Sequence, residues 1–484
     1  MNKIDKHTND LVPLELNQRV EVMDVLRGFA LCGIIFMNIE WFNRASVEMG
    51  RFDFQLTGVD WGSSWLVRLL IEGKFYRIFS LLFGMGFAVM LLQAKRKGKP
   101  FYWWFSRRMG VLFAIGLFHL IFIWGGDILH DYAIGGMMML LWMWLLKFKW
   151  MQWANNEQGF LKVGLSILTL PFVVAFVIAV FFGVSKNADE FNADYNLQVA
   201  VEKRVVEIKQ DELIAAPLIA TAVAERNGSQ KRPKVNQELM TEAELIIYKS
   251  ERRFISRHKK YLDGQEQKQI LRNGNYSEIV SYWAKNSLSE LAKTPLLAGI
   301  LSFPLFMIGY WFVISGVIVK PKEHIGLFKS MLWCGLGIGG VISAGSLIIL
   351  SHPQLRVVRD FEIVANSIFM LGQSLMCAGY LAAIVLLAIS KKTNKLVQWL
   401  SPMGKMALTN YLMQSVILAF IFFSYGLGLF GDVSRFAQMG IAVLVLALQW
   451  GMSFIWLKYY RFGPLEWLWR SLIYKQFQPL KLND

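Results

Sequence analysis

The chain has 484 residues, of which 55% are hydrophobic and 14% aromatic, while only 18% are charged. This composition excludes an ordinary soluble or disordered protein and favours one with many membrane spans. The formal net charge of +16 would suit a nucleic-acid-binding protein, but the basic residues gather in short clusters between apolar runs. Such clusters are typical of cytoplasmic loops. We therefore expect a lipid bilayer as partner and no nucleic acid.

Apolar runs long enough to cross roughly 30 Å of hydrocarbon as helices recur along most of the chain. They fall near residues 25–42, 74–93, 108–125, 128–146, 161–183, 296–319, 327–350, 363–390, 404–424 and 436–457. The sequence thus predicts an all-α, polytopic membrane helix bundle with about ten transmembrane helices. The first run ends without a small-residue cleavage pattern, so we expect it to be retained as a helix.

The basic clusters also predict the orientation of the bundle. When "KRKGK" (95–99) lies inside, simple alternation places "KFK" (147–149), "KPK" (320–322) and "KKTNK" (391–395) inside as well. Every inside turn then carries positive charge. The predicted topology has both termini in the cytoplasm, N-in/C-in.

One long stretch, residues 185–294, mixes both charge signs and reads as a water-soluble helical extracytoplasmic insertion. Its simplest role is a cap or a partner surface. No nucleotide-binding loop and no His/Cys cluster at zinc spacing is present, so we expect no metal and no resident cofactor. The predicted regions are an N-terminal transmembrane half, the insertion, a C-terminal transmembrane half and a cytoplasmic interfacial helix with a tail, at 1–184, 185–294, 295–460 and 461–484.

The first polar group lies in the opening span, "RVEVMDVLRGFALCGIIFMNIEWF" (19–42). Asp24 and Arg27 are three residues apart and share a helix face, with Arg19 at the cytoplasmic border. Asn38 lies about 16 Å further along the helix, near the outer surface. The segment is either a positive-inside anchor with an internal ion pair or a cytoplasmic mouth whose guanidinium groups grip a phosphate or carboxylate.

The second group is "FHLIFIWGGDILHDY" (118–132), in which a short outside hairpin brings Asp127 near His119. A carboxylate that fixes the tautomer of an imidazole and raises its basicity makes a general base. The alternative is a hydrogen-bonded histidine that joins two helices. His130 and Asp131 are expected at the wet edge, as weaker candidates.

Two further groups are candidates for substrate binding. In "IEGKFYRIFSLLFGMGF" (71–87), Arg77 lies deep enough to be a candidate, whereas Lys74 is expected to snorkel to the interface. Gly84 and Gly86 of the same stretch permit close helix approach.

In "SPMGKMALTNYLMQS" (401–415), Asn410 and Gln414 share a helix face. They either form hydrogen bonds between helices or line a cytoplasmic cavity, with Lys405 at its mouth. After the last span, the apolar stripe of "GPLEWLWRSLIY" (463–474) predicts an interfacial helix on the inner leaflet.

These pieces, in this order, resemble the bacterial YeiB-like family, the domain of unknown function 418. The residues that carry the resemblance are "DVLRGFALCGIIFMNI", "FSLLFGMGF", "FHLIFIWGGDILHDY", "GKMALTNYLMQS" and "GPLEWLWRSLIY". The family is similar to a wider set of transmembrane acyltransferases, including the acyltransferase 3 type and heparan-alpha-glucosaminide N-acetyltransferase. The link is "RVEVMDVLRG", which looks like the start of the acyltransferase 3 first helix.

The resemblance implies a multi-pass protein of the bacterial plasma (inner) membrane. It also implies acyl transfer from a cytoplasmic donor, acyl-coenzyme A as co-substrate, to a small-molecule or glycan acceptor outside. Arg19, Asp24, Arg27 and Lys405 would then hold the donor. Acyltransferase 3 proteins carry a histidine where this chain has Asn38. The loop that follows the first span, residues 43–73, contains no histidine either, so the base must come from elsewhere.

His119 with Asp127 is the outside-facing His/Asp pair available within the spans, and Asn38 would then serve as an oxyanion donor. Two other functions stay open on the sequence alone. A transporter for a small metabolite would use the same polar residues to line a pathway, although no inverted repeat is visible. A non-catalytic scaffold would bind its partner through the insertion.

Overall fold

In the part of the chain that it describes, the computed structural model of the protein consists of helices and the turns and loops that join them. That part is residues 13–482 without 51–52, 54, 97, 99, 185–187, 231–234 and 353–358. Within these residues the only β-type pairing is an isolated bridge between Tyr460 and Lys481. The predicted all-α class is confirmed.

The helices fall into the order expected from the apolar runs. Before residue 185 they are α1 (Pro13–Asn43), α2 (Gly58–Leu70), α3 (Phe75–Arg96), α4 (Phe101–Phe122), α5 (Leu129–Leu145) and α6 (Glu157–Val184). The insertion contains α7 (Ala188–Gln210), α8 (Glu212–Arg226), α9 (Glu242–Asn273) and α10 (Tyr276–Leu297). Then follow α11 (Phe303–Ile314), α12 (Ile325–Trp333), α13 (Gly339–Ser351), α14 (Arg359–Ile389), α15 (Asn394–Gln398), α16 (Ser401–Lys405), α17 (Ala407–Phe422), α18 (Arg435–Trp456) and α19 (Pro464–Tyr474).

Among the described residues, eight helical segments are long and apolar enough to cross a membrane. They are Glu21–Asn43, Gly58–Arg96, Phe101–Phe122, Glu157–Ala175, Leu291–Ile314, Ile325–Ser351, Glu362–Ile389 and Arg435–Trp456. Two other predicted spans coincide with shorter helices, α5 of 17 residues and α17 of 16 residues. The protein is therefore a polytopic helical membrane protein, and the count of about ten spans stays a prediction.

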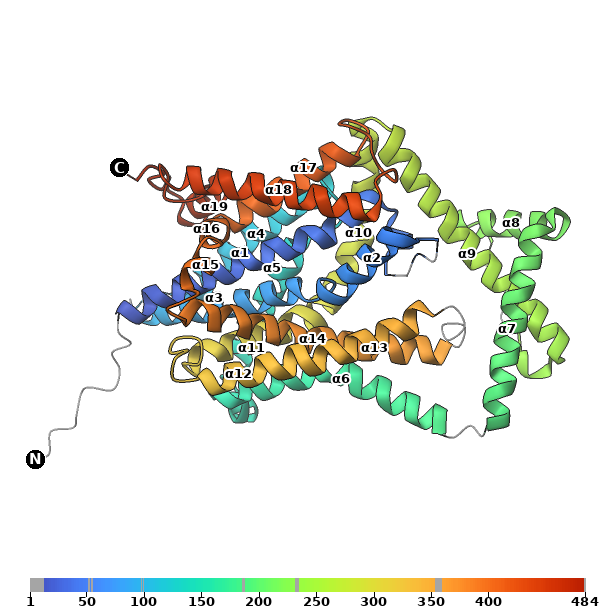
Figure 1. Ribbon diagram of the computed structural model, residues 1–484, viewed down its shortest axis with the longest axis horizontal. Coiled ribbons are helices and arrows are strands. Elements are labelled where there is room, and N and C mark those ends of the chain that lie inside the picture. Colours follow the sequence, from blue (N-terminus) through green and yellow to red (C-terminus); the bar gives the residue numbers. More distant parts are fainter. Residues whose placement is uncertain are drawn as a thin grey trace, which may run out of the picture.

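The bundle is elongated, and its two ends differ (Figure 1). Helices α12, α15, α16 and α19 lie at one end, whereas α7, α8 and α9 of the insertion extend from the other. The beginning of α1 lies at the same end as α19. This arrangement agrees with the predicted alternation of the basic clusters, although which end faces the cytoplasm stays a prediction.

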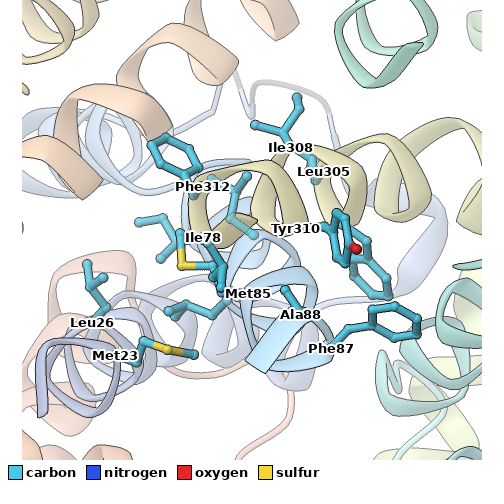
Figure 2. Packing of buried hydrophobic residues seen from close by; sticks show 14 of the residues in the cluster. Met23, Leu26, Ile78, Met85, Phe87, Ala88, Leu305, Ile308, Tyr310 and Phe312 are labelled. Carbon is cyan, nitrogen blue, oxygen red and sulfur yellow. The ribbon is translucent and has the colours of Figure 1, made fainter. Parts of the chain in front are cut away.

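The centre of the bundle is the contact between α3 and α11. A Cβ atom on Gly84 would overlap the carbonyl oxygen of Phe306, and one on Gly309 would overlap that of Leu81. Glycine is needed at both positions because the two backbones touch. Gly86 instead faces open space, so the expected close approach is correct for Gly84 and wrong for Gly86. Figure 2 shows buried side chains of α1, α3 and α11 around this contact: Met23, Leu26, Ile78, Met85, Phe87, Ala88, Leu305, Ile308, Tyr310 and Phe312.

The insertion has a small apolar core of its own between α7, α8 and α9. Its buried members are Val205, Ile208, Ala215, Ala222, Phe254 and Ile255. Glu202 of α7 accepts hydrogen bonds from Arg253 at 2.6 Å and from Arg257 at 2.8 Å, both on α9. A capping box of Thr241 and Glu244 begins α9. The helical character predicted for this stretch is therefore observed.

Candidate functional site

A buried carboxylate between two imidazoles lies where α4 passes into α5. Nδ1 of His119 is 2.9 Å from Oδ1 of Asp127, and Nδ1 of His130 is 2.8 Å from Oδ2 of Asp127. The backbone N–H of His130 donates a further hydrogen bond to Oδ2 at 3.0 Å. Gly116 leaves room for this arrangement, because a Cβ there would lie 2.8 Å from Oδ2. Both carboxylate oxygens of Asp127 thus face an imidazole.

The predicted proximity of His119 and Asp127 is therefore present, but the expected place of His130 is wrong. His130 is only 4% exposed and belongs to the cluster. The sequence signal was available, since His130 follows Asp127 by three residues at the start of a helix, where such side chains share a face. Asp131 remains at the partly exposed edge, 3.7 Å from Nε2 of His130.

His119 is fully buried, and neither ring nitrogen forms a hydrogen bond of regular geometry with the residues described. Nδ1 nevertheless lies within ion-pair distance of Oδ1 of Asp127, whereas no polar group of these residues is paired with Nε2. Its ring lies 5.4 Å from the ring of Tyr411 and 6.2 Å, edge-on, from that of Trp124. Buried polar atoms are normally hydrogen-bonded, so an unpaired Nε2 calls for an explanation. It is either a cost of packing or a place prepared for another molecule.

Asn38 lies on α1 one turn before Phe42, a residue that packs in the surroundings of His119. One turn later, Phe42 stacks on Trp124 with a centroid distance of 4.4 Å, and Trp124 lies beside His119. Residues four apart on a helix point in similar directions. The partly buried Asn38 forms no hydrogen bond with any described residue, so its amide is free to donate.

The other predicted polar group lies near the opposite end of α1. Arg27 donates a hydrogen bond of 2.6 Å to Oδ1 of Asp24, as the spacing predicts. Lys405 is exposed at the end of α16 and interacts electrostatically with Asp24. Arg19 lies within α1, but its side chain is outside the described residues. The structure therefore brings Asp24, Arg27 and Lys405 together.

Lys74 is deeper than expected, and Arg77 is buried, as its expected depth predicts. Lys74 is fully buried and donates a 2.9 Å hydrogen bond to the carbonyl of Arg68, at the end of α2. The expected snorkelling of Lys74 to the interface is thus wrong, because α2 covers it. Arg77 donates to the carbonyl of Gly73 and, at 2.9 Å, to Oε1 of Gln373 on α14. Arg77 joins α3 to α14, and its role in substrate binding stays a prediction.

Asn410 and Gln414 both face α18, as their shared helix face predicts. Nδ2 of Asn410 donates to Oγ of Ser453 at 2.9 Å, and Nε2 of Gln414 donates to Oε1 of Gln449 at 3.0 Å. Nε2 of Gln449 in turn donates to the carbonyl of Asn410 at 2.8 Å. These amides hold two helices together, which is the first of the two roles that the sequence left open.

Glu466 of α19 makes a contact between helices that the amphipathic pattern did not reveal. Its Oε1 accepts hydrogen bonds from the backbone N–H groups of Leu408 at 2.6 Å and Thr409 at 3.0 Å, and Oε2 accepts one from the Thr409 hydroxyl at 2.6 Å. It therefore satisfies N–H groups in the first turn of α17. Helix α19 carries an apolar stripe as predicted, but it is also fixed to α17 by a carboxylate.

The described residues contain no group of three or more His, Cys, Asp or Glu side chains arranged to hold a metal ion. Cys32, Cys334 and Cys377 are free thiols. Cys377 is buried and Cys32 partly buried, whereas Cys334 is exposed on the surface of its helix.

The helical bundle, its apolar spans and its enclosed polar clusters define an integral, multi-pass membrane protein. Residues 312–476 of the chain match the profile "Protein of unknown function (DUF418)", and the chain is similar to YeiB-like proteins over nearly its whole length. It is 28% identical over 481 residues to the uncharacterized protein YxaH of Bacillus subtilis, covering 98% of each chain.

Two other relatives also match over nearly their whole length. The uncharacterized protein YeiB of Escherichia coli is 22% identical over 467 residues, which cover 96% of this chain and 98% of YeiB. An uncharacterized 39.9 kDa protein of Bacillus acidopullulyticus is 24% identical over 480 residues, covering 97% of this chain and 98% of that protein. No solved structure matches the chain. The resemblance to the YeiB-like family is confirmed, and the link to transmembrane acyltransferases stays a prediction.

Proposed function

We propose that this protein transfers an acyl group from a cytoplasmic acyl-coenzyme A to a small-molecule or glycan acceptor across a bacterial inner membrane. The observation that carries the proposal is His119, whose Nδ1 faces Asp127 while Nε2 has no partner among the described residues. An imidazole oriented by a carboxylate through one nitrogen, with the other nitrogen unpaired, is the arrangement of a general base.

The reaction needs little beyond this base, because a thioester already activates the acyl group. Nε2 of His119 takes the proton of the acceptor hydroxyl while the oxygen of that hydroxyl bonds to the thioester carbonyl carbon. The carbon–sulfur bond then breaks, and the thiolate receives the proton back from His119. The amide of Asn38 would donate to the transient oxyanion. The products are the acylated acceptor and free coenzyme A.

The donor would enter at the other end of α1, where Arg27 and Lys405 flank Asp24. Arg27 and Asn38 are eleven residues apart, which is about 16 Å along a helix. The pantetheine arm must therefore thread between helices of the bundle to reach His119. The basic clusters at this end of the bundle support a cytoplasmic location for it. The relatives are bacterial proteins, which agrees with a bacterial plasma membrane.

The test uses the full chain in nanodiscs, acetyl-coenzyme A and a panel of hydroxyl and amine acceptors. Release of free thiol and labelled product are measured together, so that acyl transfer is separated from simple hydrolysis. The decisive variants are His119→Gln and Asp127→Asn. The matched control is His324→Gln, which removes an imidazole near the start of α12, away from the cluster.

We expect both decisive variants to lower the rate of transfer at least about 100-fold, as loss of a general base does, while His324→Gln leaves it unchanged. Acyl transfer that survives His119→Gln would remove His119 from the mechanism. A complete lack of transfer by the wild-type protein, combined with counterflow of a small metabolite in proteoliposomes, would show a transporter instead.

A further inference from the structure

A second polar cluster lies at the end of the bundle where α19 packs against α4 and α17. The guanidinium carbon of Arg108, on α4, lies 3.9 Å from the ring centroid of Trp469, on α19. Nε of Arg108 is buried and has no hydrogen-bond partner within the described part of the chain. Stacking on an aromatic face stabilises a guanidinium but leaves its N–H groups available. Arg108 is thus a cation with unused donors.

Three further cations lie at this end of the bundle. Arg27 and Arg470 both interact electrostatically with Arg108, and Lys405 interacts with Asp24, the partner of Arg27. These residues come from four elements that are far apart in the sequence: α1, α4, α16 and α19. Lys405 and Arg470 are exposed, so the cluster is open to a ligand.

Close packing of α16 on α1 fixes part of this arrangement. A Cβ atom on Gly404 would overlap the carbonyl oxygen of Asp24, and one on Gly28 would overlap that of Leu400. Two glycines therefore permit the backbones to touch. Lys405, directly after Gly404, is held beside Asp24 by this contact.

The carboxylates nearby do not balance the four cations. Asp24 is engaged by Arg27, and both oxygens of Glu466 accept hydrogen bonds from Leu408 and Thr409. Arg108, Lys405 and Arg470 form no ion pair with any carboxylate of the described residues. Four cations and two carboxylates leave an excess of two positive charges. Clustered like charges of this kind are stabilised by a bound anion.

We propose that Arg27, Arg108, Lys405 and Arg470 bind a phosphate group at this end of the bundle. Guanidinium groups match phosphate oxygens in bidentate geometry, and a lysine adds a mobile point charge. The phosphate belongs either to a soluble phosphorylated ligand or to an anionic phospholipid headgroup, since α19 carries exposed apolar residues such as Leu472. If the ligand is soluble, the site would anchor the acyl donor, and this role rests on the proposed function. If the ligand is a lipid headgroup, the site does not depend on the proposed function.

The test measures binding to the full chain in nanodiscs of phosphatidylcholine. One arm titrates adenosine 3′,5′-bisphosphate by calorimetry, with inorganic phosphate as a competitor. The other arm replaces part of the phosphatidylcholine with phosphatidylglycerol and measures the shift in thermal midpoint. The variants are Arg108→Gln, Arg470→Gln and Lys405→Ala, and the control is Lys147→Gln. Lys147 lies over the ring of Tyr102 at the same end of the bundle.

We expect Arg108→Gln and Arg470→Gln to weaken binding at least about tenfold each, the usual effect of losing a charge-assisted hydrogen bond. Exposed Lys405→Ala, which poses little risk to folding, is expected to weaken it less, and Lys147→Gln not at all. Binding of the bisphosphate in calorimetry would show that the phosphate belongs to a soluble ligand. A shift in the thermal midpoint that occurs only with phosphatidylglycerol would show that it belongs to a lipid headgroup. Absence of binding in both arms, or equal binding by all four variants, overturns the site.

These outcomes are separate from those of the proposed reaction. Bisphosphate binding that depends on Arg108 and Arg470, without any acyl transfer, would sustain the site and remove the reaction. Acyl transfer at wild-type rate in Arg108→Gln, Arg470→Gln and Lys405→Ala would sustain the reaction and overturn the role of the site as the anchor of the acyl donor.

Discussion

The hydroxyl of Tyr276 donates a hydrogen bond of 2.9 Å to the carbonyl oxygen of Phe122. Tyr276 begins α10, the last helix of the insertion, and Phe122 ends α4, three residues after His119. On the same helix, Trp283 lies so close to Gly125 that a Cβ there would overlap the indole. The insertion is therefore fastened directly onto the loop that carries Asp127.

Loosening this contact is expected to open the loop. In Tyr276→Phe/Trp283→Ala, the backbone amides of residues 123–128 should exchange with deuterium at least about tenfold faster, because a hydrogen bond and a large aromatic contact are both lost. Hydrogen-exchange mass spectrometry of the full chain measures this. Tyr261→Phe, on the exposed face of α9, is the control. If loop exchange is the same in all three proteins, α10 does not restrain the loop.

The sequence was sufficient for those features that depend on local spacing. The short turn after His119 limits where Asp127 can be, and the helical repeat places Asn410 and Gln414 on one face. Apolar runs of membrane length likewise predict the spans, because no other backbone satisfies its hydrogen bonds in lipid.

Features that depend on cover from a distant element could not be predicted in this way. Lys74 reads as an interfacial lysine until α2 is seen to cover it. Glu466 reads as part of the polar face of an amphipathic helix until α17 supplies three donors to it. Arg108 stacks on Trp469, which is 361 positions away in the sequence, so its surroundings cannot be predicted from its own helix. Hydrophobic periodicity carries no information about such pairings.

Asp127→Asn is expected to destabilise the protein by about 3 kcal/mol, since it leaves a buried histidine facing a group that no longer accepts through both oxygens. The thermal midpoint, followed by tryptophan fluorescence in detergent, measures the change. Asp131→Asn, whose side chain is 25% exposed, should shift the midpoint much less. Equal shifts for the two variants would mean that the carboxylate of Asp127 contributes no more than one at the surface.

Gly84→Ala and Gly86→Ala form a matched pair two residues apart on α3. The first places a methyl group against the carbonyl of Phe306 and should cost about 1 to 3 kcal/mol through overpacking. The second meets open space, so it should be neutral or stabilise α3 by up to about 1 kcal/mol. Thermal unfolding of both variants decides the matter, and a similar loss in both would contradict the α3–α11 contact.

The insertion should respond to pH through Glu202. Partial burial raises the pKa of Glu202, but the hydrogen bonds and charges of Arg257 and Arg253 lower it by more, so it lies below its ordinary value. A carboxyl group whose pKa is lower in the folded than in the unfolded state stabilises the folded state at pH values above its unfolded pKa. This stabilisation is lost as the pH falls through the folded-state pKa. We expect a loss of about 1 kcal/mol or less, because the side chains of Glu202, Arg253 and Arg257 are 27%, 27% and 41% exposed.

Hydrogen exchange in α7 and α9, corrected for the intrinsic effect of pH, measures this loss. Glu202→Gln should show weaker protection at neutral pH and little further change on acidification. The control is Glu207→Gln, which removes a carboxylate of α7 that pairs with Arg204 within the same helix. A pH response that persists undiminished in Glu202→Gln would assign it to other groups.

The amide pair between α17 and α18 is expected to couple the two helices. Gln414→Ala and Gln449→Ala each remove one partner of the 3.0 Å hydrogen bond, and a double-mutant cycle should give a coupling energy of about 0.6 to 2 kcal/mol. Unfolding in mixed detergent micelles measures it. Gln414→Ala with Gln373→Ala is the control, because Gln373 bonds Arg77 instead and should be additive within about 0.5 kcal/mol. A coupling energy near zero for the first pair, with a loss of transfer activity in Gln414→Ala, would point to substrate binding at Gln414 and not to helix pairing.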